Sequence, residues 1–171
     1  MRMLLAALAL APSVHPWPVG PAPRYTPPAR PAAVAAGRPA GELRCAAARP
    51  SYRLHVELFA NRKVVILPAG IGSSPQGCVY PIHTSAPDGI VRIARHARLT
   101  LADLFRVWGQ PLGERRLASF TSGAPVRAYV GGRLVRGPAG AIPLRRHAEI
   151  VVELGGYVPP HPFFLFAGGD S

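Results

Sequence analysis

The sequence predicts a small α+β domain in which a mixed β-sheet packs on one helix. Several short segments alternate polar and apolar residues, as half-buried strands do. One segment has the spacing of an amphipathic helix, with signals at both of its ends. The chain has 171 residues, 49% of them hydrophobic and 16% charged, which allows one packed core and an appendage.

The predicted helix begins after Thr100, which is placed to form a capping box with Asp103. It ends at Gly109, which suits a left-handed C-cap, and Pro111 prevents its continuation. Its apolar residues recur at i, i+3, i+4 and i+7 and share one face: Leu101, Leu104, Phe105 and Trp108.

Strands are expected on both sides of this helix. The segments are two strands around the turn at residues 61–62 (54–58 and 64–67), a short strand at 90–93, a hairpin formed by 126–130 and 133–135, and a last strand at 149–154. A single amphipathic helix covers only one face of such a sheet. We therefore expect a β-grasp-like fold, with a β-sandwich carrying one appended helix as the alternative.

The chain divides into four predicted segments. Residues 1–11 resemble a signal peptide, because one arginine precedes a short apolar run that ends in Ala9-Leu10-Ala11. Residues 12–44 are rich in proline, alanine and arginine and read as an extended linker. Residues 45–166 form the single α+β domain, and 167–171 are a tail. We expect an exported, extracytoplasmic protein.

The chain has two cysteines, Cys45 and Cys78. Two cysteines in an exported chain suggest one disulfide, whereas two free buried thiols would suit a cytosolic protein. Neither belongs to a C-x-x-C pair, which argues against a zinc ribbon or a thioredoxin-like motif.

The formal net charge of +12 comes almost wholly from scattered arginines. No run of basic residues and no RNA-binding motif is present, so nucleic acid is not the expected partner. An anionic surface, an envelope component or another protein suits this charge better.

No motif of the sequence points to catalysis. The glycines at 70, 72 and 77 lack the residues that complete a dinucleotide or phosphate loop, and no G-x-S-x-G segment exists. Cys78 and His83 would make a nucleophile and base only if Cys78 were not in a disulfide. The sequence therefore favours a non-catalytic domain without a cofactor.

Two histidines near predicted strands offer a metal site as the alternative. His55 lies on the less apolar face of the first strand, with Glu57 on the same face, and His83 lies in a loop. Imidazoles on neighbouring strands together with a carboxylate can bind copper or zinc. The candidate ligands are His55, His83 and Glu57.

Several segments also occur in a familiar order: residues 54–58, 68–72, 78–80 and 82–84, then Trp108-Gly109 and residues 142–144. Over about residues 45–166 the chain resembles a group of uncharacterised exported bacterial proteins, often membrane-tethered. Their hallmarks are H-x-H-x-H-L, L-H-T-H-D and G-x-I-H-I-E segments and a helix that ends in W-G.

The chain departs from that pattern at most of its histidines. Arg53 and Glu57 flank His55 in the first segment, Ser85 replaces the second histidine of H-T-H, and Arg92 and Ala94 replace the last histidine and glutamate. The resemblance implies that this chain retains the cysteines, turn glycines and helix face of the group but has lost most of its histidines. We therefore expect an exported, envelope-associated binding or structural domain, with a degenerate copper or zinc site as the alternative.

Overall fold

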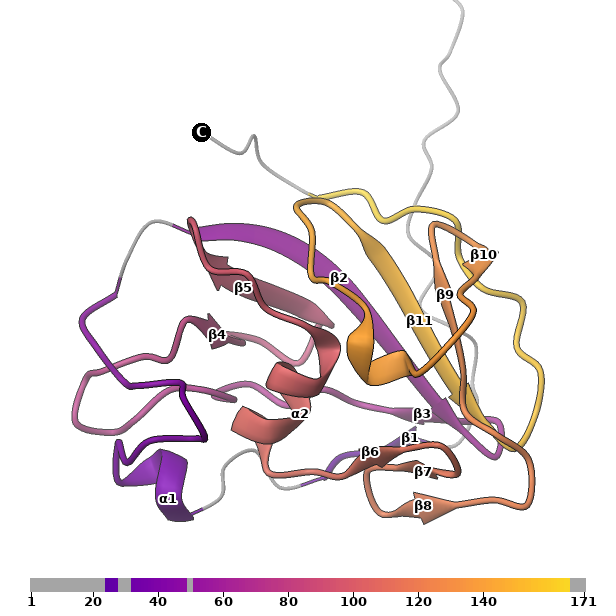
Figure 1. Ribbon diagram of the computed structural model, residues 1–171, viewed down its shortest axis with the longest axis horizontal. Coiled ribbons are helices and arrows are strands. Elements are labelled where there is room, and N and C mark those ends of the chain that lie inside the picture. The colour runs from indigo at the N-terminus through magenta and orange to yellow at the C-terminus, as the bar shows by residue number, and fades with distance from the viewer. Residues whose placement is uncertain (1–23, 28–31, 49–50, 167–171) are drawn as a thin grey trace, which may run out of the picture.

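The structure, a computed structural model, describes residues 24–27, 32–48 and 51–166. The first eleven residues and the tail at 167–171 lie outside the described residues. Figure 1 shows the elements, which are β1 (Arg24–Tyr25), α1 (Ala32–Ala35), β2 (Ser51–Ala60), β3 (Lys63–Val65), β4 (Ile82–His83), β5 (Ile90–Ala94), α2 (Leu101–Trp108), β6 (Leu112–Gly113), β7 (Arg116–Leu117), β8 (Phe120–Thr121), β9 (Arg127–Val130), β10 (Arg133–Leu134), η1 (Ala139–Ala141) and β11 (Glu149–Leu154).

The long strand β2 organises an eight-stranded mixed sheet. On one edge β2 pairs antiparallel with β3 near its end and with β5 near its start. On the other edge it pairs in parallel with β11, the last strand. Strands β9 and β10 extend the sheet beyond β11, β4 pairs with β5, and β1 pairs with β3. Strands β6 to β8 form a separate three-stranded sheet. The predicted mixed sheet with one main helix is thus present.

Helix α2 covers one face of the large sheet (Figure 1). The side chains of Leu54, Val56 and Leu58 point toward it and are almost completely buried in the main core. Ile150 and Val152 of β11 join the same core. The period of two in these strands therefore separates a face under the helix from a second face that carries His55, Glu57 and Phe59.

The ends of α2 are those that the sequence predicts. The backbone nitrogen of Thr100 donates a hydrogen bond to Asp103 Oδ2 at 2.9 Å, as in a capping box. Gly109 adopts φ 71°, a left-handed conformation that glycine takes without steric cost. Leu101, Leu104, Phe105 and Trp108 are all buried.

A disulfide joins Cys45 and Cys78, whose sequence separation is 33 residues. In the chain-entropy description, closing a loop of this length stabilises the fold by about 3–4 kcal/mol. It holds the segment before β2 against the loop after β3.

The predicted linker is described at residues 24–27 and 32–44. These residues pack against the domain and do not form an extended spacer. Strand β1 adds to the sheet beside β3, and Val34 is 1% exposed within the main core. Tyr80 Oη donates a hydrogen bond to the carbonyl of Arg38. Proline prevents long regular elements here but does not prevent packing, so the folded unit begins before residue 45.

Substitutions in α2 test this packing. Phe105→Ala should lower the free energy of unfolding by about 3–5 kcal/mol, because it leaves a cavity where a side chain is 2% exposed. Arg106→Ala should change it by at most about 1 kcal/mol, because the half-exposed Arg106 side chain contributes only a surface ion pair with Asp103. Denaturant unfolding of both variants measures the difference. Small and equal effects would mean that α2 lies loosely on the sheet.

Candidate metal centre

The second face of the sheet carries a hydrogen-bonded histidine and glutamate where β2 and β11 meet. The parallel register places His55 opposite Glu149. His55 Nδ1 lies 2.8 Å from Glu149 Oε2, and the exposed fractions of the two side chains are 7% and 1%. Two polar groups are thus buried in neighbouring central strands, where apolar side chains would be expected.

The other nitrogen of His55 fixes the state of the ring. Nε2 lies 3.0 Å from the carbonyl oxygen of Asp88, which can only accept a hydrogen bond. Nε2 therefore carries a hydrogen, and one proton is shared between Nδ1 and the Glu149 carboxylate. An imidazole whose one N–H donates to a backbone carbonyl is oriented as metal-binding histidines are, with the second nitrogen turned to the ion.

Gly89 allows the loop to approach His55 this closely. It has φ +77°, and a Cβ at this position would lie 2.6 Å from His55 Nε2 and 2.8 Å from the carbonyl oxygen of Val56. Any larger residue would push the loop and its Asp88 carbonyl away from the imidazole.

Glu149 is an unusual carboxylate for the interior of a sheet. Its Oε2 bonds to His55, but Oε1 is buried and has no hydrogen-bond partner among the described residues. Burial raises the pKa of Glu149, and the charge of Glu57 raises it further. The hydrogen bond and charge of His55, and the charge of His161, act in the opposite direction. Oε1 can therefore still accept a hydrogen bond or ligate a cation.

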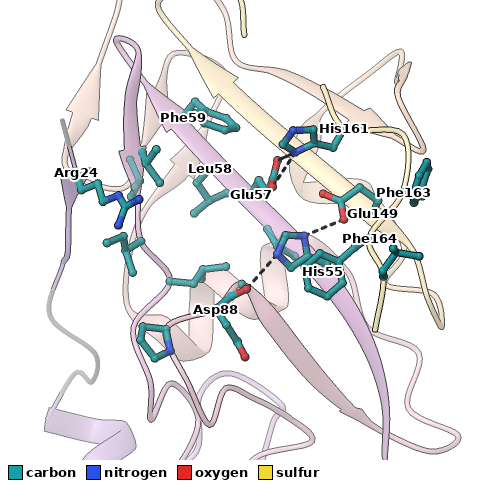
Figure 2. A pocket seen from close by; sticks show the side chains of 18 of the residues that line it. Arg24, His55, Glu57, Leu58, Phe59, Asp88, Glu149, His161, Phe163 and Phe164 are labelled. Carbon is teal, nitrogen blue, oxygen red and sulfur yellow. Dashed lines mark hydrogen bonds and ion pairs between the residues drawn. The ribbon is translucent and has the colours of Figure 1, made fainter. Parts of the chain in front are cut away.

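Glu57 brings a second carboxylate to the same place. It lies two residues after His55 on β2, so both side chains project from one face. Ligand atoms of His55, Glu57 and Glu149 all lie within 4.8 Å of one another. Both oxygens of Glu57 also contact Nδ1 of His161, at 2.9 and 2.8 Å. Figure 2 shows the four side chains converging from β2, β11 and the C-terminal segment.

The C-terminal strap, which we define as residues 157–166, closes the site from outside. Phe164 stacks on His55 with ring centroids 3.8 Å apart and an interplanar angle of 16°. The backbone nitrogen of Val158 donates a hydrogen bond to Glu153 Oε2 at 2.8 Å. Between the strap, β2, β3 and the loop at Asp88 lies a cavity of about 510 Å³, with the four polar side chains in its wall (Figure 2).

The structure brings together two of the three predicted ligands. His55 and Glu57 lie side by side, but His83 does not join them. In the strand register His83 of β4 lies opposite Arg92 of β5, and Arg92 lies opposite Arg53 of β2. His83 is therefore on the second strand from β2, level with Arg53, which is two residues before His55. At about 4.8 Å per strand, it is out of reach of an ion at His55.

His83 also has the wrong electrostatic surroundings for a cation. Burial lowers the pKa of its imidazole, the neighbouring Arg92 lowers it further, and a backbone hydrogen bond with Tyr80 opposes both effects. His83 therefore does not belong with His55 and Glu57 in the predicted set of metal ligands. The suggested pair of Cys78 nucleophile and His83 base is excluded as well, because Cys78 is in the disulfide.

Glu149 and His161 are the residues that sequence reasoning missed. Glu149 is the first residue of an apolar strand, where a charged side chain usually faces solvent. His161 follows two prolines in a segment without a regular pattern. A signal did exist, because Glu149 and Glu153 lie four residues apart in β11 and therefore share a face. Only the parallel register of β2 and β11 shows that this face meets His55.

No family model, no curated protein and no solved structure matches this chain. Among the described residues, no helix has the length and apolar character needed to cross a membrane.

The raised pKa of Glu149 predicts how stability depends on pH. A carboxyl whose pKa is raised on folding stabilises the fold most below its ordinary value, about 4.3, and this contribution is lost as the pH rises through the folded pKa. Between pH 4 and pH 7 the metal-free wild type should therefore lose stability relative to Glu149→Gln, which keeps a polar side chain but cannot ionise. Denaturant unfolding in the presence of a chelator measures it.

Glu114→Gln is the matched control, because it removes an exposed carboxylate far along the sequence from the site. Its difference from the wild type should stay nearly constant over the same pH range. If Glu149→Gln behaved in the same way as this control, Glu149 would not be an unsatisfied buried acid.

Proposed function

We propose that the protein is an exported, envelope-associated and non-catalytic binding domain whose ligand is a divalent transition-metal ion. The ion would be held by His55, Glu57 and Glu149. The observation that carries this proposal is Glu149 Oε1, a buried carboxylate oxygen without a partner among the described residues, beside an imidazole and a second carboxylate.

The donor set suits zinc, with copper as the alternative. Imidazole nitrogen and carboxylate oxygen are usual ligands of Zn²⁺, and imidazole also suits copper. Two carboxylates balance the charge of a divalent ion, which would remove the cost of burying them side by side. An ion at this place would replace the proton between His55 Nδ1 and Glu149 Oε2.

His161 offers a fourth donor. Its Nδ1 already contacts Glu57, and the strap that carries it is fixed to the sheet by Val158 and Phe164. Structural zinc sites are usually four-coordinate with protein ligands only, whereas catalytic sites keep an open position for water or substrate. Four protein donors would fill the coordination shell of a structural zinc site, which supports binding rather than catalysis.

The disulfide between Cys45 and Cys78 supports an oxidising compartment, and with it export. The pairing of the first long strand with the last supports the β-grasp-like arrangement: β2 and β11 lie parallel at the centre of the sheet, and α2 crosses one face. In this arrangement the metal ligands lie on the face opposite to the helix.

Calorimetric titration of the purified, chelator-treated full chain with Zn²⁺ tests the metal site, and Cu²⁺ serves as a second probe. His55→Ala and Glu149→Gln should each weaken binding by about 100-fold or more, since removing even an outer hydrogen-bond partner of a metal ligand costs 10- to 100-fold.

His83→Ala is the matched control, because His83 is another partly buried histidine of the same sheet and should leave the affinity unchanged. A wild-type protein that binds neither metal would contradict the proposal. So would an equal loss of affinity in His83→Ala and His55→Ala.

A further inference from the structure

The C-terminal strap carries three large apolar side chains that are about half exposed, Tyr157, Phe163 and Leu165, which we call the apolar ridge. Phe163 and Leu165 also border the cavity. Tyr157, Phe163 and Leu165 are 59%, 57% and 48% exposed, while His161 and Phe164 turn inward to Glu57 and His55. Exposed large apolar side chains gathered on one short segment usually mark a contact surface.

The hairpin of β9 and β10 extends this ridge. Leu134 of β10 is 59% exposed. The hairpin turn touches the strap, since a Cβ added at Gly132 would lie 3.3 Å from Pro162. Of the four large hydrophobic residues that are exposed in the described parts of the chain, three lie on the strap and one on this neighbouring hairpin.

Exposed arginines accompany the ridge at both ends. The register of β10 with β9 places Leu134 on the same face as Tyr129 and the strap, whereas Arg133 points to the opposite face. The exposed Arg136, two residues after Leu134, is the arginine expected beside it. At the other end Phe166 contacts His147, which follows the exposed Arg145 in the loop before β11. Along the strap, the guanidinium of Arg127 lies 5.7 Å from the centre of the Tyr157 ring, and its charge is partly balanced by Glu153, whose Oε2 lies 3.5 Å from Arg127 Nη2.

The acidic residues under the strap are turned the other way. Glu57, Glu149 and Glu153 are bonded inward, to His161, His55 and the backbone of Val158. The outer side of the strap therefore combines apolar and positive groups. This is the pattern by which proteins lie on an anionic bilayer: aromatic and aliphatic side chains enter the interface, and arginines meet the headgroups.

We propose that the ridge formed by the strap and β10 docks the protein onto a membrane surface rich in anionic lipid. The proposal rests on the envelope association in the proposed function and names its surface and partner. Docking does not require the metal ion. Vesicle binding can therefore be absent in a protein that binds zinc, and zinc binding can be absent in a protein that binds vesicles.

Sedimentation with lipid vesicles tests the docking surface in the full chain. The protein should bind vesicles of phosphatidylglycerol and phosphatidylcholine and should bind pure phosphatidylcholine vesicles much more weakly. Phe163→Ser combined with Leu165→Ser should lower partitioning by about tenfold or more, because two apolar side chains no longer enter the interface. Both positions are exposed, so an unchanged melting temperature is expected to show that the variant is folded.

A charge-matched pair of variants separates a specific surface from general attraction. Arg136→Ser with Arg145→Ser removes two exposed charges near the ridge, and Arg115→Ser with Arg116→Ser removes two exposed charges from the separate three-stranded sheet of β6 to β8. The first pair should weaken binding several-fold more than the second. No binding to anionic vesicles, equal effects of the two pairs, or wild-type binding by the Phe163 and Leu165 variant would each overturn the proposal.

Discussion

The parallel pairing of β2 with β11 is the interaction on which the rest of the structure depends. It joins the first long strand of the domain to its last across six residue pairs, from His55–Glu149 to Ala60–Leu154. Its register places Ile150 and Val152 in the core under α2 and places Glu149 beside His55 on the opposite face. A shift by one residue would exchange these faces and bury the carboxylates in the main core.

This arrangement explains why the second face of the sheet needs the C-terminal strap. A histidine and a carboxylate in the centre of a sheet lose hydration and must find partners nearby. The strap supplies His161 to Glu57, the ring of Phe164 to His55 and a backbone donor to Glu153. Among the described residues it leaves one oxygen each of Glu149 and Glu153 without a hydrogen-bond partner, and buried groups of this kind usually bind ordered water or an ion.

Local physics made much of the fold predictable from the sequence. The capping box of Thr100 and Asp103, the apolar stripe of α2 and Gly109 are signals within one helix, and the structure has them all. Pairing across long separations was not predictable in the same way. His55 and Glu57 were recognisable as a pair two residues apart, but Glu149 lies 94 residues from His55 and reaches it only through strand register. His83 looked equally suitable because a sequence does not show that strand β5, which carries Arg92, separates it from His55.

The central claim is that His55, Glu57 and Glu149 share one ion, and anomalous diffraction from crystals soaked in Zn²⁺ tests it most directly. The account predicts one strong peak at the zinc edge, about 2.0–2.2 Å from His55 Nδ1 and from a carboxylate oxygen of Glu57 and of Glu149. The density would also show whether His161 turns from Glu57 to the ion. An empty site at saturating zinc, or a peak only at His83 or at surface histidines, would contradict the account.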